Sequence, residues 1–129
     1  MSLELTLLIW SVALPGFYIG AQAMLYRAQH GVSFPATGRD NEPAPNVWNQ
    51  RAQKALRNLL ETYGVFVALA AATEIAGRSD LLTQWGALLY VFGRAAYLPL
   101  YLFAVPYLRS LVWGVAALGL VSMFVGVAF

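Results

Sequence analysis

Four polar side chains follow one another at helical intervals near the middle of the sequence: Arg51, Lys54, Asn58 and Glu61. At about 100° per residue, a helix places them all within an arc of about 80°. Two cations, an amide and a carboxylate would then share a surface that enters an apolar segment. This surface predicts a site for a charged ligand. The alternative for Lys54 and Arg57 is a basic flank that sets the membrane topology.

A second polar set lies in a later apolar segment: Tyr90, Arg94, Tyr97 and Tyr101. Its spacing places one arginine and three phenols within an arc of about 60° on a helix. An ionisable group at the bilayer centre costs about 2.5–3.5 kcal/mol on insertion scales. Arg94 therefore predicts a ligand site or an internal ion pair, with Glu61 as the candidate partner. For the tyrosines, ordinary packing with a hydroxyl partner remains the alternative.

Two further arginines stand at the ends of apolar segments. Arg109 begins the last segment, and an arginine beside the positive end of a helix dipole makes a strong anion site. The alternative is that Arg109 only sets the topology, since cytoplasmic loops carry an excess of lysine and arginine. Arg27 ends the first segment, where it is either a snorkelling end residue or a further ligand contact.

The elements that position these side chains are long apolar stretches, each sufficient to cross about 30 Å of hydrocarbon. With the polar first turns included, the predicted spans are about 4–26, 50–77, 82–105 and 108–128, joined first by a loop of about 28–45. We expect an all-α membrane protein with four transmembrane helices in a single domain, 1–129. Gly77 is the predicted C-terminal cap of the second helix, and Asp80 the N-cap of the third.

The orientation follows from the basic residues near the connections. The first connection and its flanks contain most of them: Arg27, Arg39, Arg51, Lys54 and Arg57. Arg109 follows the third helix, and the connection between the second and third helices holds only Arg78. We therefore expect a multi-pass cell-membrane protein with a cytoplasmic first loop and both termini outside. Trp48, Trp85 and Trp113 are expected at the interfaces.

Composition excludes several classes of function. The 129 residues are 60% hydrophobic and 11% charged, far from the roughly 25% charged residues of soluble domains. A net charge of +2, without an open basic face, gives no indication of nucleic-acid binding. There is no cysteine, and the single His30 cannot build a zinc site, so we expect no metal. Any chemistry must come from Arg, Lys, Tyr, Asn and Glu, or from the ligand.

Both polar sets resemble motifs of the MAPEG family, the membrane-associated proteins of eicosanoid and glutathione metabolism. The second-helix signature of that family is roughly R-x-x-R-A-x-x-N-x-x-E followed by an aromatic residue. The matching residues here are Arg51, Lys54, Asn58, Glu61 and Phe66, with Lys54 where the family usually has arginine. The third-helix set matches Arg94, Tyr97, Tyr101 and Arg109-Ser110. The resemblance covers essentially the whole chain.

This resemblance implies a homotrimer that binds glutathione between neighbouring subunits near the cytoplasmic side. Glutathione would be the cosubstrate of a membrane transferase or peroxidase acting on a lipophilic electrophile or hydroperoxide. Its site would be lined by Arg51, Lys54, Asn58, Glu61, Arg94, Tyr97 and Tyr101, with Arg27 as a further candidate. Arg109 would face the thiol as the catalytic residue.

Two other hypotheses remain. One is a non-catalytic trimeric membrane protein that binds another anion or a lipid. The other is a small four-span transporter, which is weaker because such exporters have an acidic residue embedded in the first helix. Here Glu4 lies at the extreme end of that helix.

Overall fold

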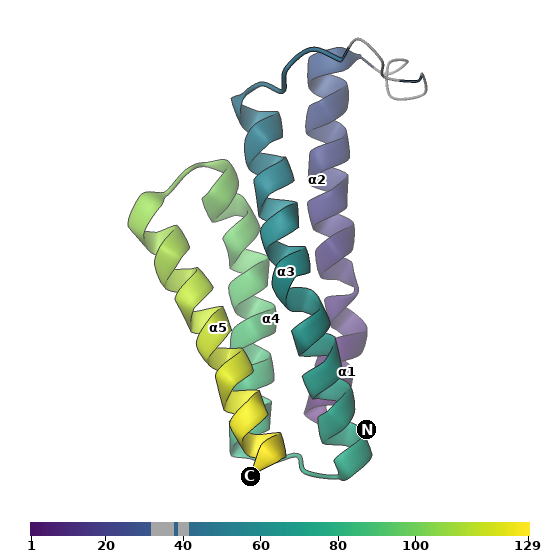
Figure 1. The fold of residues 1–129 in the computed structure, drawn as a ribbon, viewed down its shortest axis with the longest axis vertical. Coiled ribbons are helices and arrows are strands. Elements are labelled where there is room, and N and C mark those ends of the chain that lie inside the picture. The colour runs from purple at the N-terminus through teal and green to yellow at the C-terminus, as the bar shows by residue number, and fades with distance from the viewer. Residues whose placement is uncertain (32–37, 39–41) are drawn as a thin grey trace.

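The computed structural model describes residues 1–31, 38 and 42–129, and within them it is all-helical, as the sequence predicts. The helices are α1 (Leu3–Ser11), α2 (Ala13–His30), α3 (Val47–Ala76), α4 (Leu81–Leu102) and α5 (Pro106–Ala128). Figure 1 shows an up-and-down bundle whose two termini lie at the same end. The predicted loop of 28–45 includes residues 32–37 and 39–41, so this part of it, Arg39 included, lies outside the described residues.

The first span is two helices rather than one continuous helix. Proline at position 15 has no N–H to donate to the Ser11 carbonyl, and its ring crowds that carbonyl. The regular hydrogen-bonding pattern is accordingly interrupted at Val12, although its backbone keeps helical dihedral angles (φ −58°, ψ −26°). The Ser11 hydroxyl lies 2.6 Å from the Leu8 carbonyl oxygen and 2.9 Å from the Tyr63 hydroxyl oxygen, which ties the break to α3.

The ends of α3 and α4 are set by local sequence. Asn46 caps α3, with its side chain accepting from the Asn49 N–H at 2.8 Å. Gly77 ends α3 in the left-handed region, at φ 64°, and Asp80 forms a capping box with Thr83 at the start of α4. The predicted roles of Gly77 and Asp80 are confirmed.

The backbones of α4 and α5 are in direct contact between the early part of α4 and the C-terminal half of α5. A Cβ atom built on Gly86 would lie 2.5 Å from the Gly119 carbonyl oxygen, and the reverse distance is also 2.5 Å. Only glycine permits this approach. The two helices separate toward the end where Pro106 begins α5 (Figure 1).

The turn between α4 and α5 lies earlier in the chain than the sequence predicts, since α5 begins at Pro106 and not near 108. The predicted third span reaches 105, whereas α4 ends at Leu102. Ala104 has φ 53°, a left-handed conformation that is uncommon for residues other than glycine. The Val105 N–H donates to the Leu100 carbonyl oxygen at 3.0 Å, which closes the turn.

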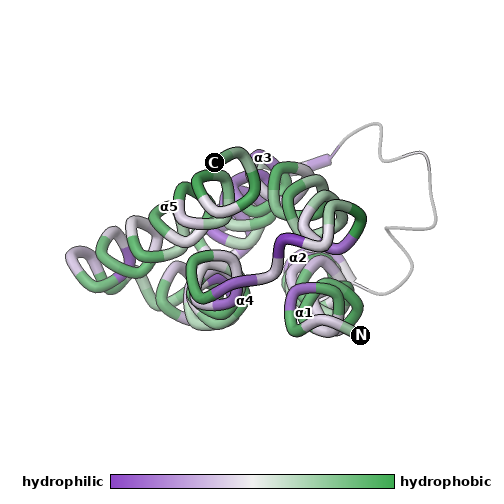
Figure 2. Tube along the Cα trace, turned by 90° about the horizontal axis from the view of Figure 1, so that it is seen from below, coloured by the Kyte–Doolittle hydropathy of each residue, from purple (hydrophilic) through white to green (hydrophobic). Residues whose placement is uncertain are grey.

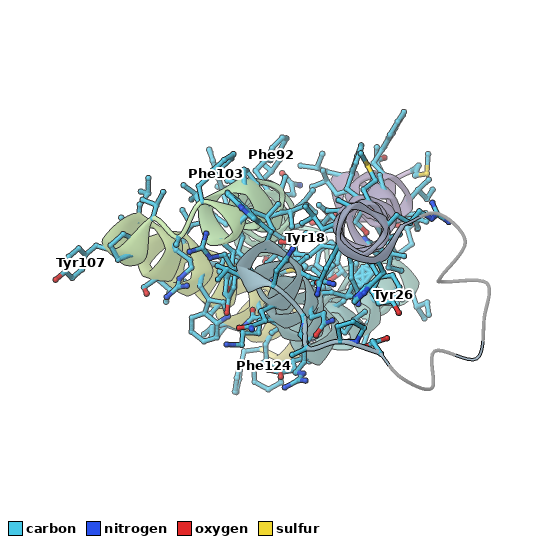
Figure 3. All side chains as sticks on the ribbon, turned by 90° about the horizontal axis from the view of Figure 1, so that it is seen from above. Tyr18, Tyr26, Phe92, Phe103, Tyr107 and Phe124 are labelled. Atoms are coloured by element: carbon cyan, nitrogen blue, oxygen red, sulfur yellow. The ribbon has the colours of Figure 1, made fainter. Side chains whose placement is uncertain are left out.

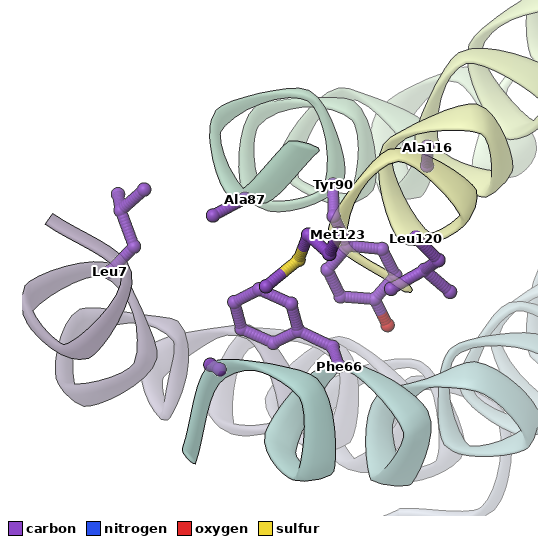
Figure 4. Close-up of a cluster of buried hydrophobic side chains, with 8 residues drawn as sticks. Leu7, Phe66, Ala87, Tyr90, Ala116, Leu120 and Met123 are labelled. Carbon is purple, nitrogen blue, oxygen red and sulfur yellow. The ribbon is translucent and has the colours of Figure 1, made fainter. Parts of the chain in front are cut away.

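Two apolar clusters form the interior. In the first, shown in Figure 4, the Phe66 and Tyr90 rings stack at 4.7 Å, and Met123 packs beside them. The second joins Leu14 and Tyr18 of α2 to Leu59 of α3. Figure 2 shows that apolar residues extend along every helix, and many large ones are exposed, which fits a lipid environment.

Three stretches in the described chain are long and apolar enough to cross a membrane: Leu3–His30, Val47–Ala76 and Pro106–Ala128. The prediction of four spans is therefore supported by length and composition for three of them. The 22-residue α4 is not among these three stretches. It contains Arg94, and the side chains of Tyr90, Arg94 and Tyr97 are buried in the protein.

Candidate functional site

A polar pocket of about 280 Å³ opens where α4 and α5 separate. Its lining comes from α3, α4 and α5: Asn58, Tyr97, Tyr101, Arg109, Ser110 and Trp113. Four of the nine predicted site residues are among these, namely Asn58, Tyr97, Tyr101 and Arg109. The structure therefore brings together side chains from both polar sets of the sequence.

Arg109 is held by an aromatic side chain. Its guanidinium carbon lies 4.7 Å from the centre of the Tyr101 ring, within cation–π range. The Tyr101 ring in turn lies 5.5 Å from that of Tyr97. Arg109 belongs to the first turn of α5, and Val105, the residue before α5, provides no side-chain cap. The positive end of α5 and the Arg109 charge thus act on the same region, which favours an anion.

Arg94 lies behind the pocket and does not line it. Its side chain is 1% exposed, and its Nη1 donates to the Asn58 Oδ1 at 2.8 Å. Its guanidinium carbon lies 4.3 Å from the centre of the Tyr97 ring. Asn58 and Tyr97 therefore stand between Arg94 and any ligand in the polar pocket.

The backbone around Arg94 is held from α2. The Tyr18 hydroxyl donates to the Arg94 carbonyl oxygen at 2.6 Å. Tyr18 points into the bundle in Figure 3, whereas Tyr107 points away from it. The ion pair considered between Arg94 and Glu61 is not formed in the described chain, where Arg94 bonds Asn58 instead.

The polar side chains of α3 divide between different surroundings. Arg51 donates from Nη1 to the Leu102 carbonyl oxygen at 3.0 Å and lies over the Trp48 ring at 5.3 Å. It thereby satisfies a carbonyl at the end of α4. Lys54 and Glu61 are exposed. The polar residues on this face of α3 therefore have three different surroundings. Arg51 contacts the end of α4, Asn58 lines the polar pocket, and Lys54 and Glu61 are exposed on an open surface.

That open surface contains a second polar hollow, of about 510 Å³, between α2 and α3. Glu61 lines it beside Arg57, with amides from both helices; the full lining is Gln22, Gln53, Leu56, Arg57, Leu60 and Glu61. Arg27 is exposed in the last turn of α2 and lines neither hollow. Of the nine predicted site residues, four line the polar pocket and Glu61 lines the second hollow, whereas the other four line neither: Arg27, Arg51, Lys54 and Arg94.

Five lining residues of the two hollows carry hydrogen-bond donors and are not among the predicted site residues: Ser110, Trp113, Gln22, Gln53 and Arg57. Trp113 was expected at a membrane interface, but it lies four residues after Arg109 on α5, and that spacing alone would have placed both on one face. Ser110 directly follows Arg109 in the sequence. For Arg57 the sequence leaves open a basic flank that sets the topology and a place beside the polar set, and the structure places it in the second hollow.

An apolar groove of about 560 Å³ lies between the first span and α4, lined by residues such as Phe17, Met24, Val91 and Leu98. It has almost no polar lining and suits a lipophilic molecule. Within the described residues no group of three or more His, Cys, Asp or Glu side chains could hold a metal ion.

The model of the MAPEG family matches residues 6–129, nearly the whole chain. No curated protein and no solved structure matches significantly.

Proposed function

Since the chain belongs to the MAPEG family, we propose that it is a glutathione-dependent membrane transferase or peroxidase. Arg109 is the residue that stabilises the glutathione thiolate, and the polar pocket holds the thiol end of the ligand. The family includes glutathione transferases and related enzymes. The proposal extends that general chemistry to particular residues of this chain.

The observation that best supports this function is the position of Arg109 in the pocket. Its guanidinium is held 4.7 Å over Tyr101, at the uncapped start of α5. A free thiol has a pKa near 8.5, so a thiolate at neutral pH needs a positive surrounding. Arg109 and the first amides of α5 supply one, and the chain itself has no cysteine. The nucleophile then belongs to the cosubstrate.

A homotrimer would complete the site. At about 280 Å³ the polar pocket is below the roughly 300–1,000 Å³ of pockets that enclose small ligands. Glu61 lies at the middle of α3 and is exposed, and a carboxylate at that depth is costly if it faces lipid. In a ring of three copies, one neighbour would cover Glu61, and the other neighbour would bring its own hollow of Arg57 and Glu61 to the pocket.

The polar side chains match the groups of glutathione. Arginine forks suit its two carboxylates, a role proposed for Arg51 and, less strongly because its ammonium is a point charge, for Lys54. Glu61 would receive the ammonium. Asn58 accepts from Arg94 through Oδ1, which leaves its Nδ2 group to donate to the ligand. In this proposal Arg94 is a positioning residue that holds Asn58 and Tyr97.

The reacting partner would be a lipophilic molecule that arrives from the bilayer. In the transferase reaction the thiolate sulfur bonds the electrophilic carbon, and the leaving group departs with the electron pair. In the peroxidase reaction the sulfur takes the outer oxygen of a hydroperoxide, the O–O bond breaks, and a proton completes the alcohol. The basic residues around the first loop support an orientation with this loop in the cytoplasm and both termini outside the cell membrane.

The test is a thermal-shift titration of the detergent-solubilised protein with glutathione, together with turnover of a lipophilic electrophile. Arg109→Ala should retain glutathione binding but lose the ultraviolet absorbance of the bound thiolate and most turnover. Arg78→Ala is the matched control, because Arg78 bonds the Val127 carbonyl oxygen at the far end of the bundle. Unchanged turnover in Arg109→Ala would remove this residue from the mechanism.

The same titration separates the main alternative. No stabilisation of the wild-type protein by millimolar glutathione would favour a non-catalytic trimeric membrane protein that binds another anion or a lipid. The sequence feature that supports this alternative is Lys54, which stands where the family usually has arginine and binds a carboxylate less well.

A further inference from the structure

The apolar groove of about 560 Å³ between the first span and α4 follows α2 toward the first loop. Ala13 and Met24 both line it, and they are about 17 Å apart along α2 at 1.5 Å per residue. One leaflet of a bilayer supplies about 15 Å of hydrocarbon, half of the roughly 30 Å core. The groove therefore has the length of one lipid acyl chain within a single leaflet.

Packing between α2 and α4 forms this groove without any ligand. Gly16 and Gly20 leave its α2 side open, since a Cβ atom built on either would meet no other part of the protein within 4 Å. The α4 side is made by Val91, Ala95 and Leu98. The Tyr18 hydroxyl bonds the Arg94 carbonyl oxygen at 2.6 Å, which fastens α2 to α4. A chain entering the groove therefore meets two walls that are already held together.

A positive charge follows the groove at its loop end. Arg27 lies three residues after Met24, in the last turn of α2. Helical spacing places it within the same arc of about 100° as five groove residues of α2: Ala13, Gly16, Phe17, Gly20 and Met24. The Arg27 side chain is exposed and forms no hydrogen bond or ion pair within the described residues. Arginine side chains at helix ends extend toward the lipid headgroups, so an acyl chain in the groove would have its headgroup beside Arg27.

We propose that this groove binds one acyl chain of an anionic phospholipid, whose phosphate pairs with Arg27. The apolar walls alone would not select a lipid, because every lipid tail is as apolar as they are. Selection comes from the guanidinium, which can bind phosphate oxygens bidentately, and a zwitterionic headgroup offsets that attraction with its own ammonium. The groove lies on a different side of α4 from Tyr97 and Tyr101 of the polar pocket, so the proposal does not depend on the proposed enzymatic activity.

The test uses the full-length protein in an uncharged detergent without glutathione, titrated with dioleoyl phosphatidylglycerol or dioleoyl phosphatidylcholine. Both lipids should raise the midpoint of thermal unfolding in a saturable manner, and phosphatidylglycerol should do so at lower concentration. Arg27→Gln should weaken the apparent affinity for phosphatidylglycerol about fivefold, the factor for about 1 kcal/mol per basic residue near a membrane surface. Its phosphatidylcholine response should not change. Arg78→Gln is the matched control and should keep the preference, because Arg78 bonds the Val127 carbonyl oxygen at the other end of the bundle.

Gly20→Leu tests the groove itself, because its side chain would occupy the space of the acyl chain. This variant should lose the response to both lipids, whereas Gly64→Leu, at an equally open glycine of α3 outside the groove, should keep it.

Three results would overturn the proposal. Equal wild-type responses to the two lipids would remove the pairing with Arg27, and an unchanged response in Gly20→Leu would place the lipid elsewhere. Dissociation of an oligomer by Gly20→Leu, measured by light scattering, would make the groove an interface between copies of this chain. Should Gly20→Leu fail to fold, the comparison of Arg27→Gln with Arg78→Gln decides, and equal affinities refute the site.

Discussion

The contact between α4 and α5 predicts a strong response to a single methyl group at Gly119. A Cβ atom there would lie 2.5 Å from the Gly86 carbonyl oxygen and 3.1 Å from the Leu89 Cβ. Ordinary contacts begin at 3.4 Å, so moving from 2.5 Å to 3.4 Å separates the helices by about 0.9 Å. The carbonyl belongs to a rigid helix and cannot rotate aside as a flexible side chain would. Both helices must therefore shift.

The magnitude follows from two opposing terms. Overpacking of a close contact costs about 1–3 kcal/mol. Alanine in a helix interior gains up to about 1 kcal/mol over glycine. Gly114→Ala, five residues earlier on the same helix, should gain this helix stability without a clash, because no atom lies within 4 Å of the added Cβ. The difference between the two variants isolates the steric cost, which we expect to be about 1–3 kcal/mol.

The assay is unfolding of each variant in mixed detergent and SDS micelles, followed by circular dichroism. Glutathione-dependent turnover gives a second measurement, because a shift of α5 moves Arg109 relative to Tyr101. Gly119→Ala should be less stable and less active than Gly114→Ala. If Gly119→Ala proves as stable as Gly114→Ala, the backbone contact does not limit the packing of these helices, and the reasoning fails.

Two further predictions concern the ends of helices, and the same unfolding assay measures both. Ala104→Gly should stabilise the protein by about 1 kcal/mol, because Ala104 has φ 53° and the left-handed region costs other residues about 1–2 kcal/mol; a loss of stability would show that the turn is unstrained. Glu4→Ala should destabilise by about 1–3 kcal/mol, because the fully buried carboxylate accepts from Ser79 at 2.8 Å and from Thr83 at 2.6 Å. Glu4→Gln, which keeps one acceptor oxygen, should lose less, and equal losses would contradict this role.

The sequence by itself determined the class of fold, the helix ends and the helical faces on which some of the pocket residues lie. Long apolar stretches require helices in lipid, since no other open structure satisfies the backbone there. Gly77 and Asp80 mark helix ends through local capping chemistry, and both were predicted correctly. Periodicity placed Tyr97 and Tyr101 on one face of α4, and the structure puts both in the same pocket with Arg109. These features depend on neighbours within a few turns of one helix.

Only the tertiary structure decided which residues on one face of α3 or α4 line a pocket and which are buried or exposed. Arg94 shares a helical face with Tyr97, yet it is buried behind the pocket, because Asn58 approaches it from α3. Glu61 and Asn58 are one turn apart but open into different hollows, since α2 lies on one side of α3 and α5 on the other. The depth of a side chain depends on which helix covers it. That is a matter of packing between distant segments, and helical spacing alone does not determine it.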